Sequence, residues 1–325
     1  MKLGVIGAGA WGTALAQVAA KNGPVLLWAH ESDVVGAINR EHQNPIFLPG
    51  VPLDPDIHAT HELAELAACD ALLVVTPAQH MRGVLAQAGV GAQPLLLCSK
   101  GIEAGSMALM SEAAAKACPE APIAVLSGPT FAAEVARGLP TALTLACEDD
   151  AVATRLAERI ARPGFRPYRS SDVIGAEIGG AVKNVLAIAC GVVEGAGLGR
   201  NARAALIARG FAEMTRFGLA RGAKAETLAG LSGLGDLVLT CSSEQSRNFT
   251  LGLGLGQGHK PAELMADRRT VAEGAFTAPV LIQAAAAVGV EMPISEAVAD
   301  LLLGATDVAQ AVERLLARPL RDESA

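Results

Sequence analysis

Aromatic side chains are scarce in this chain: Phe, Trp and Tyr together make up 3% of its 325 residues. Proteins that bind single-stranded nucleic acid stack bases on such side chains, so a base-stacking platform is not expected. Positive charge is also in deficit, because 26 Lys and Arg face 33 Asp and Glu and the net charge is −7. The chain therefore has no general attraction to a phosphate backbone or an anionic membrane, and an anionic ligand must be bound by a few placed cations.

Cysteine patterns are missing as well. The six cysteines are scattered and form neither a CxxC pair nor the spacing of a zinc site, which predicts reduced, mostly buried thiols in the cytoplasm and no metal site. They are Cys69, Cys98, Cys118, Cys147, Cys190 and Cys241.

No stretch has the roughly 18 uninterrupted apolar residues that a membrane span needs. Residues 3–20 come nearest, since only Thr13 and Gln17 are polar there, and with Lys2 in front they look like a signal peptide. The glycines at positions 4, 7, 9 and 12 instead fit a strand, a turn and a helix, so we expect this segment to belong to the fold. With 51% hydrophobic residues, the chain should fold compactly as a soluble protein.

The first half alternates short aliphatic runs with amphipathic stretches. Continuous apolar runs indicate strands that are buried on both faces, and helical connections between them predict an α/β Rossmann-type, doubly wound parallel sheet over residues 1–171. The expected strands are 2–6, 25–28, 71–75, 95–98, 123–126 and 142–146. The expected helices are 13–22, 32–41, 61–68, 79–88 and 106–117.

Strand patterns end near Ser171, and Ser170-Ser171-Asp172 is typical of a linker or a helix start. We expect residues 172–325 to form an all-α domain that binds substrate and carries the catalytic group. Its predicted helices are 181–194, 202–221, 279–288, 295–303 and 306–318.

The sequence Gly7-Ala8-Gly9-Ala10-Trp11-Gly12 matches GxGxxG directly after a strand and before a helix. Glycines there allow a tight turn and let backbone N–H groups approach a pyrophosphate, so the motif predicts a bound dinucleotide. An acid after the second strand would favour NAD, but this chain has Ala29-His30 at that point. His30 favours NADP(H), although NAD and a surface histidine without contacts both stay open.

Polar clusters follow three of the predicted strands, at the edge of the sheet where ligands bind in such folds. They are Thr76-Pro77, Ser99-Lys100-Gly101 and Ser127-Gly128-Pro129-Thr130. Lys100, flanked by Ser and Gly at a strand end, is better placed to meet a ligand than an ordinary surface lysine.

Lys183 and Asn184 interrupt an otherwise apolar helix. Lys183 either extends its ammonium group past apolar neighbours to water or faces a cleft between the domains, where burial near other cations would lower its pKa toward that of a useful proton donor. Two further polar groups flank an irregular, glycine-rich region: Asp236, which could orient a hydroxyl or a lysine, and Arg247, which could hold a phosphate. Each of these residues could instead make only local hydrogen bonds.

Seven segments together closely resemble the bacterial NAD(P)-dependent glycerol-3-phosphate dehydrogenase family: GAGAWGTALA, SKGIE, SGPTFAAEVARGLPTA, GGAVKNVLAIA, GLGDLVLTC, SRN and VAEG. The resemblance implies reversible hydride transfer between NADPH, or NADH, and dihydroxyacetone phosphate. The product is sn-glycerol 3-phosphate for phospholipid synthesis. The family also implies a helical second domain like that of 6-phosphogluconate dehydrogenase, and a homodimer.

The resemblance also assigns roles to individual residues. Lys183 matches the proton donor and acceptor. Substrate-contacting positions match Lys100, Gly128, Thr130, Lys183, Asp236, Ser246, Arg247 and Asn248. Cofactor-contacting positions match Gly7, Gly9, Ala10, Trp11, Gly12, His30, Lys100, Ala132, Arg247, Val271 and Glu273. Ala10 departs from the family, which often has a serine there that can bond to the cofactor.

Two other classes remain as alternatives. A β-hydroxyacid dehydrogenase or ketopantoate reductase would share the two-domain plan but lack a phosphate site such as Ser246-Arg247-Asn248. A catalytically silent sensor of the NADP redox state would bind the cofactor without needing a buried lysine.

Overall fold

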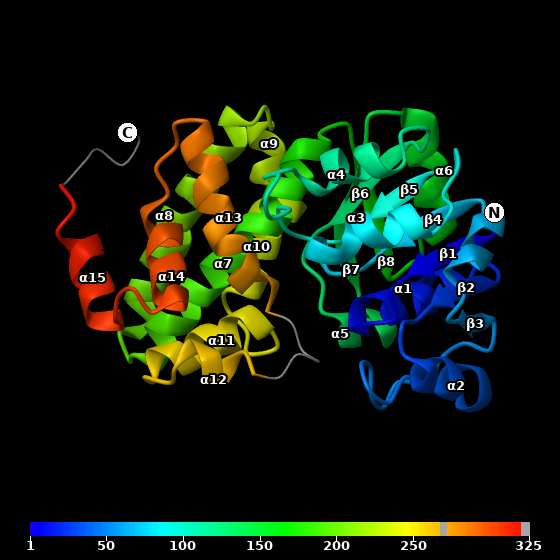
Figure 1. The fold of residues 1–325 in the computed structure, drawn as a ribbon, viewed down its shortest axis with the longest axis horizontal. Coiled ribbons are helices and arrows are strands. Elements are labelled where there is room, and N and C mark those ends of the chain that lie inside the picture. Colours follow the sequence, from blue (N-terminus) through cyan, green and yellow to red (C-terminus); the bar gives the residue numbers. More distant parts are fainter. Residues whose placement is uncertain (267–271, 320–325) are drawn as a thin grey trace.

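A single sheet of eight strands forms one half of the molecule, in the order β3-β2-β1-β4-β5-β6-β7-β8 (Figure 1). The computed structural model describes residues 1–266 and 272–319. The strands are β1 (Leu3–Ile6), β2 (Val25–Trp28), β3 (Ile57–Thr60), β4 (Ala71–Val74), β5 (Leu95–Leu97), β6 (Ile123–Ser127), β7 (Thr141–Cys147) and β8 (Phe165–Ser170). This sheet confirms the expected Rossmann-type fold class.

One strand pair differs from the fully parallel prediction. β7 runs antiparallel to β6, whereas all other neighbouring strands in the sheet are parallel. The chain between these two strands contains only the short helix α5 (Ala132–Ala136), which packs on α1 (Ala10–Ala20). A connection that does not cross the sheet reverses the direction of the chain, and the next strand is then antiparallel.

Both faces of the sheet are covered, as the continuous apolar runs predict. Leu3 and Val5 of β1 point into one buried cluster, and Ile6 points into another on the opposite face. The covering elements in this half are α1, α2 (Ser32–Glu41), a 3₁₀ helix (Leu63–Ala68), α3 (Ala78–Gln87), α4 (Met110–Ala117), α5 and α6 (Asp150–Ile160).

The other half is helical and is built around α7 (Val173–Gly195), which is buried along almost its whole length. By length and composition α7 could cross a membrane, but 94% of its most apolar window is buried inside the fold, as in a core helix. The surrounding elements are α8 (Gly199–Ala220), α9 (Ala225–Leu228), a π-helical segment (Leu231–Gly235), α10 (Asp236–Thr240), α11 (Arg247–Gly256), α12 (Pro261–Leu264), α13 (Glu273–Ala287), α14 (Pro293–Leu303) and α15 (Val308–Leu316) (Figure 1).

Helix α11 packs very closely on α7, although its glycine-rich sequence does not predict a helix. Gly191 and Gly195 of α7 face Gly252 and Gly256 of α11. A Cβ atom at Gly191 would lie 2.0 Å from the carbonyl oxygen of Phe249. Glycines four residues apart share one face of a helix, so these pairs let the two backbones touch and fix α11 beside α7.

Candidate active site

The glycine-rich turn joins β1 to α1 and leaves space for a ligand. Gly7 has φ +113°, a conformation that favours glycine, and a Cβ atom at Gly12 would lie 1.8 Å from the carbonyl oxygen of Gly7. The Cβ position of Gly9, by contrast, meets nothing within 4 Å. The first N–H groups of α1 are thus approachable along Gly9, as binding of a pyrophosphate requires.

A buried amide braces this turn from behind. Asn44 has no exposed surface, and its Nδ2 donates to the carbonyl oxygen of Ala8 at 2.8 Å and to Oγ1 of Thr13 at 2.8 Å. Thr13 Oγ1 in turn donates to the same carbonyl at 3.1 Å. Sequence reasoning missed Asn44, because it lies outside the motif and only the fold brings it there.

Other residues expected to contact the cofactor lie around the same turn. Trp11 and Ala10 are half-buried in the first turn of α1, and Ala132 is half-buried at the start of α5, which packs on α1. His30 follows β2 and is exposed, with its ring centroid 6.2 Å from that of Trp28. Val271 lies outside the described residues.

The two lysines singled out in the sequence meet at one carboxylate. Nζ of Lys183 on α7 lies 2.6 Å from Oδ1 of Asp236, and Nζ of Lys100 after β5 lies 2.6 Å from Oδ2. Asp236 begins α10 and has no exposed surface. Lys183 also donates to Oγ1 of Thr240, one turn further along α10, at 2.9 Å. The carboxyl edge of the sheet and the helical half are therefore joined by a buried Lys–Asp–Lys cluster.

The environment of Lys183 favours the loss of its proton. Its side chain is only 8% exposed, and burial lowers its pKa to about 8. The charge of Lys100 lowers this pKa further, while Asp236 opposes the change. An amine with such a pKa can both give and accept a proton near neutral pH.

A third cation, Arg247, lies on the helical side of the same region. It is exposed in the first turn of α11, where Ser246 accepts a hydrogen bond from the N–H of Phe249 and so caps the helix. The Asn248 amide is buried: Nδ2 donates to Oδ1 of Asn184 at 3.0 Å, and Oδ1 accepts from the N–H of Gly274 at 2.9 Å. These bonds fix the first turn of α11, which carries Arg247, beside α7 and the start of α13.

Glu273 links the three cations electrostatically. Burial raises the pKa of its carboxyl group, and the charges of Arg247, Lys100 and Lys183 oppose that rise. The carboxylate also accepts a hydrogen bond from the N–H of Ala78, at the start of α3. Glu273 therefore spans from the helical half to the sheet half beside the lysine cluster.

The strand end after β6 contributes a tight backbone approach. A Cβ atom at Gly128 would lie 2.7 Å from Cα of Leu143, so no larger residue fits there without a shift. Thr130 is half-buried and its Oγ1 donates to the carbonyl oxygen of Gly128 at 3.3 Å.

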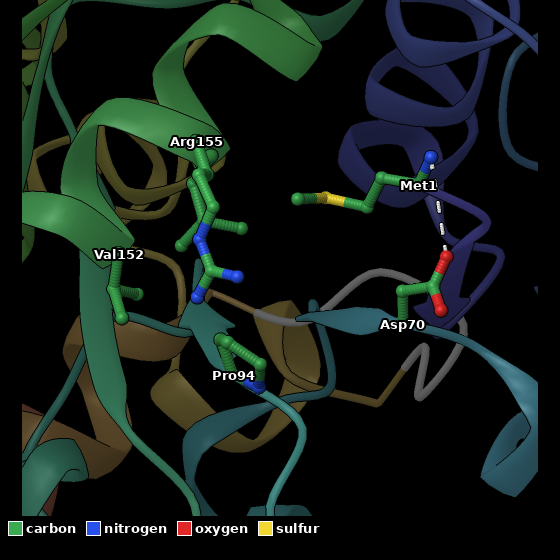
Figure 2. Close-up of a pocket in the computed structure, with 6 residues that line it drawn as sticks. Met1, Asp70, Pro94, Val152 and Arg155 are labelled. Atoms are coloured by element: carbon green, nitrogen blue, oxygen red, sulfur yellow. Dashed lines mark ion pairs between the residues drawn. The ribbon is translucent and has the colours of Figure 1, made fainter.

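A cavity elsewhere in the molecule is separate from this cluster. Figure 2 shows it at the amino ends of the strands, where the terminal ammonium of Met1 lies 3.9 Å from Asp70, near Pro94 and Arg155. In a sheet of this type ligands bind at the opposite, carboxyl ends. Lys100 and Thr130 lie at that opposite edge, because they follow β5 and β6, and Lys100 reaches Asp236 of the helical half from there.

Comparison with known proteins decides the family. The profile of the NAD-dependent glycerol-3-phosphate dehydrogenase N-terminus matches residues 2–153, and that of the C-terminus matches residues 172–313. The chain belongs to the NAD-dependent glycerol-3-phosphate dehydrogenase family.

Relatives agree over almost their whole length. Glycerol-3-phosphate dehydrogenase [NAD(P)+] 1 of Sphingopyxis alaskensis is 65% identical, over 98% of this chain and 97% of its own. Glycerol-3-phosphate dehydrogenase [NAD(P)+] of Caulobacter vibrioides is 59% identical over 99% of both chains. The crystal structure of glycerol-3-phosphate dehydrogenase from Coxiella burnetii superposes with a TM-score of 0.93 at 40% identity, covering 98% of this chain and 99% of that one.

In this member of the glycerol-3-phosphate dehydrogenase family, the structure adds Thr240 to the residues around Lys183. Sequence reasoning passed over Thr240 because a threonine in an apolar segment is not unusual. Its spacing of four from Asp236 places both side chains on one face of α10, which is the signal that could have identified it.

Proposed function

We propose that the protein catalyses reversible hydride transfer between NAD(P)H and dihydroxyacetone phosphate, giving sn-glycerol 3-phosphate for phospholipid synthesis. The observation that carries this proposal is the buried cluster of Lys183, Asp236 and Lys100. Lys100 lies at the carboxyl edge of the sheet, the edge at which the glycine-rich turn follows β1. A silent nucleotide sensor would have no need for two lysines on one buried carboxylate, whose desolvation is costly.

Lys183 is the proposed proton donor in the reducing direction. NAD(P)H, when bound at the glycine-rich turn, would supply the hydride that the carbonyl carbon of the substrate accepts. The carbonyl oxygen then gains negative charge, and Nζ of Lys183 gives it a proton. Asp236 and Thr240 hold Nζ in place at 2.6 and 2.9 Å, and Lys100 adds positive potential that stabilises the developing alkoxide. The reverse reaction uses neutral Lys183 as the base.

The phosphate of the substrate is assigned to Arg247, with Ser246 and Asn248 beside it. A guanidinium group binds phosphate through two parallel hydrogen bonds, and its binding energy orients the carbonyl group toward Lys183. Gly128 and Thr130 are assigned to the wall of the substrate site at the end of β6.

The cofactor is assigned to the turn at Gly7, Gly9, Ala10, Trp11 and Gly12. The open Cβ position of Gly9 and the left-handed Gly7 support this assignment. His30, Ala132, Val271 and Glu273 complete the proposed set, with Lys100 and Arg247 shared with the substrate. Because His30 stands where an acid would repel the 2′-phosphate, we propose a preference for NADPH, with NADH as the second cofactor.

Three broader features complete the proposal: division at residue 171 into a dinucleotide-binding and a substrate-binding domain, a cytoplasmic location, and a homodimer. The end of β8 at Ser170 and the start of α7 at Val173 support the division.

An absorbance assay tests the proposed reaction. The purified protein is mixed with dihydroxyacetone phosphate and either NADPH or NADH, and oxidation of the nicotinamide is followed; ketopantoate and unphosphorylated dihydroxyacetone serve as controls. We expect turnover of the phosphorylated ketone, faster with NADPH. Turnover of ketopantoate alone, or cofactor binding without any turnover, would contradict the proposal.

A further inference from the structure

We propose that Ser127 is a further substrate-contacting residue, whose hydroxyl group recognises the free hydroxymethyl end of dihydroxyacetone phosphate. This inference rests on the proposed function. Ser127 is the last residue of β6 and is 3% exposed. Its Oγ has no hydrogen-bond partner among residues 1–266 and 272–319. Buried hydroxyls nearly always have a partner, so one without a partner in the protein points to a ligand.

The Ser127 hydroxyl lies beside the lysine cluster. A Cβ atom at Gly180 of α7 would be 2.9 Å from Oγ of Ser127 and 3.3 Å from Cδ of Lys100. No side chain larger than that of glycine fits at position 180 without a shift, so α7 comes close to Ser127 and to the stem of Lys100 together. Gly180 precedes Lys183 by three residues, and residues at that spacing lie on one face of a helix.

Successive positions along helix α7 correspond to the three parts of the substrate: the phosphate, the carbonyl group and the hydroxymethyl group. Asn184 is joined to Asn248 at 3.0 Å, which marks the phosphate end beside Arg247. Lys183 marks the carbonyl group. The helix rises about 1.5 Å per residue, so Gly180 lies about 5 Å back along the axis from Lys183, away from Asn184. A triose phosphate with its phosphate at Arg247 and its carbonyl at Lys183 therefore extends its hydroxymethyl group toward Ser127.

Two other buried hydroxyls, those of Thr76 and Ser232, also lack a partner in the described part of the chain. Thr76 follows β4, and its N–H is 3.3 Å from the Cβ position of Gly7, on the cofactor side. Ser232 belongs to the π-helical segment before Asp236 and has no exposed surface. Of these hydroxyls, the structure places only Ser127 next to the stem of Lys100.

The test compares dihydroxyacetone phosphate with hydroxyacetone phosphate, the same ketone without the free hydroxyl group. For Ser127→Ala we expect kcat/KM with dihydroxyacetone phosphate to fall about 10-fold, the worth of one buried hydrogen bond. With hydroxyacetone phosphate the change should be less than about 2-fold, so the preference between the two ketones shrinks. If wild-type protein does not reduce the deoxy ketone, its inhibition constant against dihydroxyacetone phosphate provides the same comparison.

Ser99→Ala is the matched control, because Ser99 also follows a strand at this edge but its hydroxyl already donates to the carbonyl oxygen of Thr76 at 2.5 Å. It should alter the rates with both ketones by the same factor. Ser127→Cys has a side chain of similar size, but its thiol forms only weak hydrogen bonds. It serves as the test variant if Ser127→Ala fails to fold.

An unchanged preference in Ser127→Ala and in Ser127→Cys, in a protein that reduces dihydroxyacetone phosphate, would overturn this proposal alone. A wild-type protein that does not reduce dihydroxyacetone phosphate would overturn the proposed function, and this inference with it.

Discussion

Nζ of Lys183 lies 2.6 Å from Oδ1 of Asp236, a carboxylate with no exposed surface. The same carboxylate holds Lys100 at 2.6 Å through its other oxygen. Two ammonium groups thus share one negative charge in a buried place. The bond to Asp236 fixes the position of Nζ of Lys183, and burial together with the charge of Lys100 makes its proton easier to remove.

The pH dependence of the reaction follows from the pKa of Lys183. Burial lowers that pKa to about 8, and the reducing direction needs the protonated amine. We expect kcat/KM for dihydroxyacetone phosphate to be level below about pH 8 and to fall above it. Oxidation of glycerol 3-phosphate needs the neutral amine, so its kcat/KM should rise with pH through the same range. Steady-state rates in both directions from pH 6 to 10 check this; profiles with the same slope in both directions would contradict it.

Arg247 should control substrate affinity more than turnover. In Arg247→Ala we expect KM for dihydroxyacetone phosphate to rise about 10- to 100-fold, because a charge-assisted pair is lost, while kcat changes less. Arg155→Ala is the control, because Arg155 is an exposed arginine at the far, amino-terminal edge of the sheet, and it should leave this KM unchanged. A KM equal to that of the wild type would show that the phosphate binds elsewhere.

Glu177 makes stability depend on pH. This carboxyl group on α7 is 6% exposed and accepts hydrogen bonds from the N–H and Oγ of Ser111 on α4, at 2.7 and 2.5 Å. Burial raises its pKa from 4.5 to about 7, so between these values the folded protein binds more protons than the unfolded chain. Its contribution to stability is therefore fully present below about pH 4.5 and is lost as pH rises through about 7.

Glu177→Gln removes this titration. Urea unfolding at pH 5, 6, 7 and 8 should show that the unfolding free energy declines less with pH in the variant than in the wild type. Some decline remains in the variant, because Glu213 is also buried and its pKa is raised to about 7. Glu120→Gln, at an exposed position, should leave the decline unchanged. Equal declines in wild type and Glu177→Gln would disprove the assignment.

Continuous apolar runs made the central strands predictable from sequence, and β2 begins and ends where the pattern predicts. The edge strands were not predicted. β3 is only Ile57–Thr60, and β8 carries Arg166, Pro167 and Arg169, so neither shows the run of a strand that is buried on both sides. Helix α11 was missed because its glycines weaken the helical pattern, and the reason for them, contact with α7, exists only in the folded protein.

In the candidate site, too, the residues with a local sequence signal were predicted and most of those that depend on the fold were missed. Lys183 and Lys100 stand out in sequence because each is a cation in an apolar or strand-end setting. Asn44 and Thr240 act through partners that are distant in sequence or one helical turn away, and Ser127 is notable only because its hydroxyl has no partner in the described part of the chain. The partners of Asn44 and the surroundings of Ser127 depend on tertiary contacts, which no local pattern contains, whereas the spacing of Thr240 from Asp236 can be seen in the sequence.

The most direct test of the account is the rate of dihydroxyacetone phosphate reduction by wild type and Lys183→Ala, with cofactor affinity measured on both by nicotinamide fluorescence. We predict that Lys183→Ala binds NADPH as the wild type does but turns over about 10²- to 10⁴-fold more slowly, the usual contribution of a general acid. Turnover at the wild-type rate with intact cofactor binding would contradict the central role of Lys183.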